Sequence, residues 1–213
     1  MQDQRRVVID YVSPSVNGGE IYIKRVVNEI VNIKTYILAD GHDVLGASVL
    51  YKHENEKNWH ENRIHLVVNN EWEGAFQVGK QGFYSYKIEA WVDYALNWQH
   101  GIERKIADNQ HVNSELLEGV AFLNDIHEKL SHNDKLYLDH LKNIFVNEHN
   151  YDEAIKEATS KRLHHIFFNH PQKILANTSK EFKVYVDRKK ARFSTWYEFF
   201  PRSASQHQGV HGT

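Results

Sequence analysis

The sequence of 213 residues lacks cysteine altogether. This excludes a disulfide framework, a thiolate metal site and a cysteine nucleophile, and it is typical of a reducing compartment. No long apolar run is present either, because the N-terminal stretch Val7–Ile9 is too short for a signal-peptide core or a membrane span. The net charge is only −2 at pH 7, so no general positive field favours nucleic acid. These absences predict a cytoplasmic protein with neither a membrane nor a nucleic-acid partner.

Motifs for common chemistries are also missing. A nucleophile elbow, a P-loop, a dinucleotide fingerprint and a zinc signature do not occur, so neither a cofactor nor a metal is predicted. The 15 histidines are scattered, and the one adjacent pair, His164-His165, would point about 100° apart on a helix. The acidic loop Asp40–Asp43 is open to two interpretations, a cation site or a tight turn, and its glycine and aspartates favour the turn.

Two further sets of residues have side chains suited to carbohydrate chemistry. Glu89 and Asp93 stand four apart on a predicted strand, which separates them by about 13 Å at ~3.3 Å per residue. That exceeds the spacing of about 5–9.5 Å between paired glycosidase carboxylates, so no catalytic residue is predicted. Tryptophans can stack on sugar rings, but burial in a core is the favoured interpretation for most of this set. They are Trp59, Trp72, Trp91 and Trp98.

Residues up to about 93 have the period-2 pattern of antiparallel strands. Val31, Ile33, Thr35 and Ile37 alternate with polar or amphipathic residues, and Asn69-Asn70 suits a two-residue hairpin turn. Turn signals separate seven such segments, which indicates an immunoglobulin-like antiparallel β-sandwich. The predicted strands are 6–11, 20–25, 31–37, 47–52, 64–68, 72–78 and 84–92.

The period changes to 3.6 between about Trp98 and Lys180. Apolar stripes there predict three or four short amphipathic helices that stop near Pro171. The predicted N-terminal caps are Asn113, either Ser131 or Asn133, and a capping box Asn150–Glu153. The stripes Leu116/Val120/Leu123 and Leu138/Leu141/Phe145 offer more apolar surface than a small bundle need bury internally. Strand character returns at Phe182–Asp187, so the helices are interpreted as an insert in the sandwich.

The segment after residue 190 carries five large aromatic residues within eight positions, Phe193, Trp196, Tyr197, Phe199 and Phe200. Each such side chain buries roughly 150–250 Å² in a folded core, and only a polar stretch follows. This pattern predicts that the sequence stops just after the first strand of a further domain. The predicted α+β organisation is then a sandwich (1–97 plus 181–190), a helical insert (98–180) and the start of a truncated barrel (191–213).

Several segments, in order along nearly the whole chain, resemble one family. They include Ala39-Asp-Gly-His-Asp43, Glu89-Ala-Trp-Val-Asp93, Ser114-Glu-Leu-Leu-Glu-Gly119 and Ala191–Ser203, the last containing Trp-Tyr-Glu-Phe-Phe-Pro-Arg-Ser. The family is the bacterial maltosyltransferase that uses maltose 1-phosphate to extend α-1,4-glucans. Residues from about 123 to 167 match it poorly.

The resemblance implies that the sandwich and its insert contribute to a homodimer and precede an α-amylase-type (β/α)₈ barrel. It places the first barrel strand at Trp196–Arg202 and the catalytic carboxylates beyond the sequence, so this fragment is expected to be inactive. Glucan and maltose 1-phosphate are the implied substrates of the full-length protein. The only binding candidates are Trp196, Tyr197, Glu198 and Arg202, near the expected start of the barrel.

One alternative stays open at this stage. The chain could be a glucan-binding sandwich of another α-amylase relative, such as a branching or debranching enzyme. That function would need an exposed row of tryptophans. The exposed position or burial of the tryptophans therefore discriminates between the two hypotheses.

Overall fold

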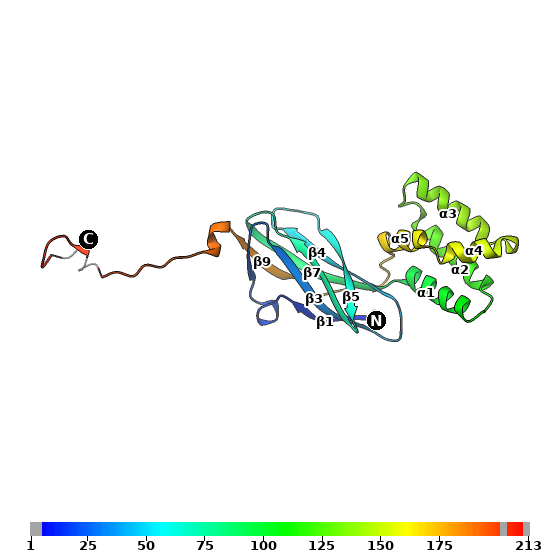
Figure 1. Cartoon of the computed structure of the whole chain (residues 1–213), viewed down its shortest axis with the longest axis horizontal. Helices are drawn as coiled ribbons and strands as arrows, with labels where there is room; N and C mark the ends of the chain where they lie inside the picture. Colours follow the sequence, from blue (N-terminus) through cyan, green and yellow to red (C-terminus); the bar gives the residue numbers. More distant parts are fainter. Residues whose placement is uncertain (1–5, 201–203, 211–213) are drawn as a thin grey trace.

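The computed structural model describes residues 6–200 and 204–210. Within these ranges it is a mixed α/β structure with a curled nine-stranded sheet and five α-helices. The helices gather at one end of the sheet, and the C-terminal segment leaves from the opposite end (Figure 1). The strands are β1 (Val7–Ser13), β2 (Ile23–Val26), β3 (Ile30–Ala39), β4 (Leu45–His53), β5 (His60–Val68), β6 (Glu71–Gln77), β7 (Gly82–Val92), β8 (Asn177–Thr178) and β9 (Phe182–Asp187).

The strand order is β1-β3-β6-β5-β4-β7-β9-β2, and β8 pairs with β7. The returning strand β9 pairs antiparallel with β7, with Tyr84 opposite Val184, which confirms the prediction that Phe182–Asp187 rejoins the sheet. One pair departs from the all-antiparallel prediction, because β2 and β9 are parallel, with Ile23 opposite Val184. Both strands run in the direction opposite to β7. The strand β2 lies before the helical insert in the sequence, and β9 lies after it.

The sheet encloses a hydrophobic core on its concave side. The alternation predicted in β3 is confirmed, since Val31, Ile33, Thr35 and Ile37 are all buried while Asn32 and Tyr36 are exposed. Curling of the sheet also brings β1 against β7, although these strands are not hydrogen-bonded neighbours. Side chains from strands distant in the sheet order thus share one core.

The predicted turn at Asn69-Asn70 joins two strands that are neighbours in the sheet. Asn69 adopts a positive φ of 52°, and the strands on either side of Asn69-Asn70 pair antiparallel, so the hairpin prediction is confirmed. The segment between Gln77 and Gly82, by contrast, does not form a hairpin turn, because the strands it joins, β6 and β7, are not neighbours in the sheet. It carries the chain across the fold from one part of the curled sheet to the other.

The helices are α1 (Tyr94–Ala107), α2 (Asn113–His127), α3 (His132–Phe145), α4 (Tyr151–Ala158) and α5 (Lys161–Asn169), with short 3₁₀ turns at Asn17–Gly19, Glu148–Asn150 and Lys189–Arg192. The first helix begins four residues before the predicted boundary at Trp98, because Asp93 accepts a hydrogen bond from Leu96 N at 3.2 Å and caps it. The predicted end near Pro171 is confirmed. None of the helices in the described ranges is long and apolar enough to cross a bilayer.

The predicted caps had mixed outcomes. Ser131 is the N-cap of α3, where its hydroxyl accepts from Asp134 N. The prediction for Asn113 is wrong, because Val112 occupies the cap position and Asn113 is already helical. The Asn150–Glu153 capping box is also wrong, because the Asn150 side chain makes no cap hydrogen bond. Here the chain enters α4 directly from a 3₁₀ turn, which removes the extended backbone that a capping residue normally adopts.

The helices bury a second hydrophobic cluster, distinct from that of the sheet. Leu116, Leu123, Leu138, Leu141 and Phe145 are all buried in it. The two apolar stripes are therefore satisfied within the chain. This corrects the expectation that they leave a surplus of apolar surface. The stripe of α2 and the stripe of α3 are both covered, because α2 packs against α3 and α4.

The C-terminal segment leaves the sheet through the 3₁₀ turn Lys189–Arg192. Arg192 ties this turn to the β2–β3 connection by an ion pair of 2.5 Å with Glu29. The expected barrel strand is not formed between residues 196 and 200, and Arg202 lies outside the described residues. A strand needs a hydrogen-bonded partner, and within the described residues this segment has none.

Candidate functional site

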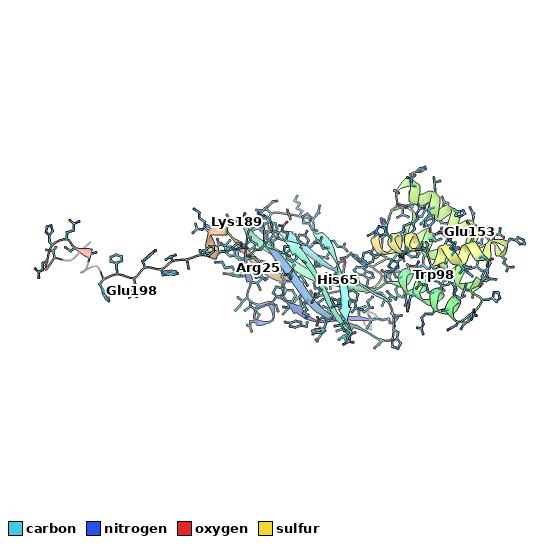
Figure 2. The ribbon with its side chains drawn as sticks, viewed as in Figure 1. Arg25, His65, Trp98, Glu153, Lys189 and Glu198 are labelled. Atoms are coloured by element: carbon cyan, nitrogen blue, oxygen red, sulfur yellow. The ribbon has the colours of Figure 1, made fainter. Side chains whose placement is uncertain are left out.

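Residues 193–200, which we call the aromatic segment, hold three of the four binding candidates, namely Trp196, Tyr197 and Glu198. Trp196 and Tyr197 are 90% and 88% exposed, and Trp196 Nε1 donates to Ser194 Oγ at 3.1 Å. Figure 2 shows Glu198 on this extended segment, clear of both the sheet and the helices. The segment therefore presents its aromatic side chains to solvent.

The acidic loop Asp40–Asp43 fastens the sheet to the helices. Asp43 forms an ion pair with Arg6 at 2.7 Å, and its Oδ1 accepts from Asn97 Nδ2 at 3.1 Å. The oxygen of the same side chain, Asn97 Oδ1, accepts a hydrogen bond from Val44 N at 3.2 Å. The Asp43 carboxylate is thus engaged by protein groups on both sides of the loop.

The carboxylates Glu89 and Asp93 lie on different elements. Glu89 is within β7, whereas Asp93 follows the strand and caps α1. This corrects the prediction that both stand on one strand. The strand ends at Val92 because the Asp93 side chain binds the first turn of the helix, which favours helix initiation at that point.

The tryptophans are mostly buried. Trp72, Trp91 and Trp98 are 6%, 0% and 7% exposed, which confirms the core interpretation for them. Trp59 is half-buried, and the ammonium groups of Lys52 and Lys87 lie 4.8 and 4.6 Å from its ring centre. The described sheet therefore lacks the exposed tryptophan row that the glucan-binding alternative requires.

Polar and aromatic groups gather where the sheet meets the helices, and we call this set the junction cluster. Its central residue is Arg63 of β5, whose guanidinium carbon lies 4.7 Å from the ring centre of Trp91 and 4.4 Å from that of Phe168 in α5. Burial lowers the pKa of Arg63, opposed by the charges of Asp93 and Glu61. The cluster comprises Glu61, Arg63, Glu89, Trp91, Asp93, Phe168 and Lys173.

Lys173, in the connection from α5 to β8, bridges two strands of the sheet. Its ammonium group lies 2.8 Å from Glu61 Oε1 and 2.7 Å from Glu89 Oε2. Ser48 Oγ also donates to Glu61 Oε1 at 2.7 Å. Burial works to raise the pKa of Glu61, but the hydrogen bonds and charge of Lys173, together with Ser48, lower it overall. Glu61 is therefore held as a carboxylate.

Asp93 is the other titratable group of the junction. Burial raises its pKa, while the hydrogen bond from Leu96 N and the nearby Arg63 and Trp91 act in the opposite direction. No sequence motif marks the junction cluster. The only local signal was that Glu61 and Arg63 share the face of β5 opposite to the buried Ile64.

The chain is similar in sequence to a family of known proteins. Residues 5–188 match the family model described as "Alpha-1,4-glucan:maltose-1-phosphate maltosyltransferase, domain N/S". Curated proteins named alpha-1,4-glucan:maltose-1-phosphate maltosyltransferase also match. Those of Chlorobaculum tepidum and Methylacidiphilum infernorum are 34% and 32% identical, each over 99% of this chain. That of Myxococcus xanthus is 34% identical over 97% of this chain.

The alignments cover a limited part of each relative. This chain spans 31% of the Chlorobaculum and Methylacidiphilum proteins and 32% of the Myxococcus protein. Because almost all of this chain is aligned, the aromatic segment beyond residue 188 has a counterpart in these relatives too. The match to the family model over most of the chain shows that it belongs to the alpha-1,4-glucan:maltose-1-phosphate maltosyltransferase family, in the region of domain N/S.

Proposed function

We propose that this chain is the N-terminal, non-catalytic part of a maltosyltransferase that transfers maltosyl units from maltose 1-phosphate to α-1,4-glucans. The aromatic segment is the observation that carries this proposal. Its five aromatic side chains are 70–90% exposed, and the segment aligns with relatives about three times as long. Exposed apolar patches of this kind mark surfaces that another folded unit covers. In the proposal that unit is a (β/α)₈ barrel with its first strand at 196–202.

The proposal includes a finer description of the fold. We interpret the curled sheet as an immunoglobulin-like sandwich formed by 1–97 and 181–190, with the helices of 98–180 as an inserted bundle and 191–213 as the start of the barrel. The separate hydrophobic clusters of sheet and helices support this division. The lack of cysteine supports a cytoplasmic location.

The chemistry of the reaction also supports a non-catalytic role. A retaining glycosyl transfer needs two carboxyl groups about 5–5.5 Å apart across the reacting bond. Glu89 is engaged by Lys173, and Asp93 caps α1. Both have structural partners that a catalytic role would have to displace. The family match and the buried tryptophans disfavour the alternative of a branching-type glucan-binding module.

The purified chain is expected to release no phosphate from maltose 1-phosphate in the presence of a maltooligosaccharide acceptor. The measurement is a phosphate-release assay, with the full-length Chlorobaculum tepidum relative as the positive control. Release above the buffer blank that disappears in Glu89→Gln or Asp93→Asn would contradict the proposal. It would place the active site within these residues.

We further propose that the chain forms a homodimer through its helices. The predicted stripes are buried internally, so this proposal rests on other residues. Leu117 of α2 and Val146, just after α3, are 55% and 58% exposed and line one shallow groove with Asn113 and Tyr151. In a two-fold interface, residues near the axis meet their own copies, so one apolar patch of this kind can serve both subunits.

Light scattering is expected to give a dimer for this chain and for a version that ends at Lys190. Leu117→Asp should shift both toward monomer, because it places a charge in the apolar patch. Leu136→Asp is the matched control, since Leu136 is 57% exposed but lies outside the groove. A chain that becomes monomeric after shortening would show that the aromatic segment, and not the helices, holds the subunits together.

A further inference from the structure

Arg63 of the junction cluster is an unusual arginine. Its Nε and Nη1 are buried and, among the described residues, have no hydrogen-bond partner. It also forms no ion pair with any described carboxylate. Buried donors left without acceptors cost free energy, so each one calls for an explanation, such as a bound ion or water.

The guanidinium cannot readily turn toward bulk solvent to solve this problem. It lies between the rings of Trp91 and Phe168, at 4.7 and 4.4 Å from their centres. One ring belongs to the sheet and the other to α5, so the guanidinium contacts both parts of the chain. An arginine fixed in this manner is preorganised for a ligand that brings its own acceptors.

A pocket opens beside Arg63. It has a volume of about 470 Å³, and its lining includes Arg63, Lys129, His170 and Lys173. Lys129 forms no ion pair among the described residues. The sheet and the helices thus contribute cationic groups to one cavity.

The acidic group in the pocket does not neutralise these cations. Glu61 is the only acidic residue among those that line this pocket, and it already accepts from Lys173 and Ser48. Lys173 in turn is shared between Glu61 and Glu89. Asp93 and Glu61 act on Arg63 through their charge, but neither accepts a hydrogen bond from its buried Nε or Nη1. These two donors of Arg63, and the ammonium group of Lys129, therefore remain available to a negatively charged ligand.

We propose that this pocket binds a small oxyanion, a phosphate group carried by a metabolite or free in solution, with Arg63 and Lys129 as its principal contacts. Phosphate oxygens supply several strong acceptors, and arginine matches their geometry better than other cations do. A ligand held there contacts both the sheet and the helical side of the junction, so its binding also stabilises their relative placement.

The test is a titration of the ¹⁵N-labelled chain with inorganic phosphate, and separately with glucose 1-phosphate, at constant ionic strength. The expected result is a saturable shift of the Arg63 side-chain Nε–H signal, with no such shift in chloride. Tighter binding of the ester identifies a metabolite as the source, and tighter binding of inorganic phosphate identifies the free ion. A Kd of about 1 mM corresponds to about −4 kcal/mol, so titration to about 20 mM detects even weak binding.

Variants decide whether the pocket is responsible. Lys129→Gln should weaken binding about tenfold, the usual effect of losing one charge-assisted hydrogen bond. Lys156→Gln, an exposed lysine of α4, should leave it unchanged. Arg63→Met removes the observed side-chain signal itself, so binding to this variant is followed through the backbone amide signals of Asn169 and His170, which line the pocket. These signals should show no saturable shift with phosphate, while the chain stays folded because methionine can fill the space beside the two rings.

Three results would overturn the proposal. One is the absence of saturation up to about 20 mM, which would mean that water satisfies the Arg63 donors. Another is an equal loss in Lys129→Gln and Lys156→Gln, which would indicate general charge screening. The third is retention of binding in a folded Arg63→Met variant. If that variant does not fold, the two lysine variants still decide the question.

Discussion

Leu138→Ala is expected to destabilise the helical cluster by about 2–5 kcal/mol, the range observed for truncation of a fully buried leucine. Leu138 of α3 has no exposed surface and packs in the cluster formed by α1 to α5. Removing its side chain leaves a cavity that the surrounding helices fill only in part. Denaturation in urea, followed by far-ultraviolet circular dichroism, measures the loss.

Leu136→Ala provides the matched control for this prediction. Leu136 stands two residues earlier on the same helix but is 57% exposed, so its truncation should change stability by no more than about 0.5 kcal/mol. Because sheet and helices have separate cores, hydrogen exchange after Leu138→Ala should increase in α2 and α3 more than in β3 or β7. Equal increases in the sheet would show that the two cores unfold as one unit.

A pair of glycine substitutions should have effects of opposite sign. Gly119→Ala is expected to destabilise the chain by about 1–3 kcal/mol through overpacking, because an added Cβ would lie 2.4 Å from Trp98 Cζ2. Gly101→Ala should stabilise it by about 0.5–1 kcal/mol, since alanine favours helix and its Cβ would meet nothing within 4 Å. Both glycines lie inside helices, and thermal unfolding compares them.

The clash at Gly119 cannot be relieved by a small movement of Trp98. The indole is surrounded by Phe122, Phe145 and Phe167, each with its ring centre 6.1 Å away. Its Nε1 also donates to Glu115 O at 2.7 Å, which ties it to the same helix that carries Gly119. A neutral or stabilising Gly119→Ala would mean that this packing is looser than the structure indicates.

Local periodicity predicted most of the elements but not their neighbours in the sheet. The strands around Val31–Ile37 and Phe182–Asp187, and the helix end before Pro171, follow from side-chain alternation and from the backbone restriction of proline. The parallel pairing of β2 with β9 was not predicted. Residues of this pair are separated by the whole helical insert, so no short stretch of sequence contains information about their register.

The N-terminal caps of the helices were likewise only partly predictable from local sequence. Ser131, one of the two cap candidates predicted for α3 beside Asn133, caps that helix, because its hydroxyl needs only the backbone three residues ahead. Asn113 and Asn150 had the same chemistry yet do not cap their helices. Before α2 the backbone is held by a tertiary contact, the hydrogen bond from Val112 N to the Tyr151 hydroxyl. Before α4 it is held by a 3₁₀ turn, in which Asn150 N donates to Asn147 O. Propensity alone does not include such contacts.

The sequence by itself determined most of the segments that form strands and helices, because hydrophobic periodicity acts over a few residues and follows from the geometry of each element. Only the tertiary structure decided that Lys173 meets Glu61 across 112 residues, and that Arg63 is enclosed by rings from the sheet and from α5. Each of those residues has an unremarkable local context. Their proximity arises when two separately packed cores are joined at one end of the sheet, and that arrangement depends on contacts between segments far apart in the chain.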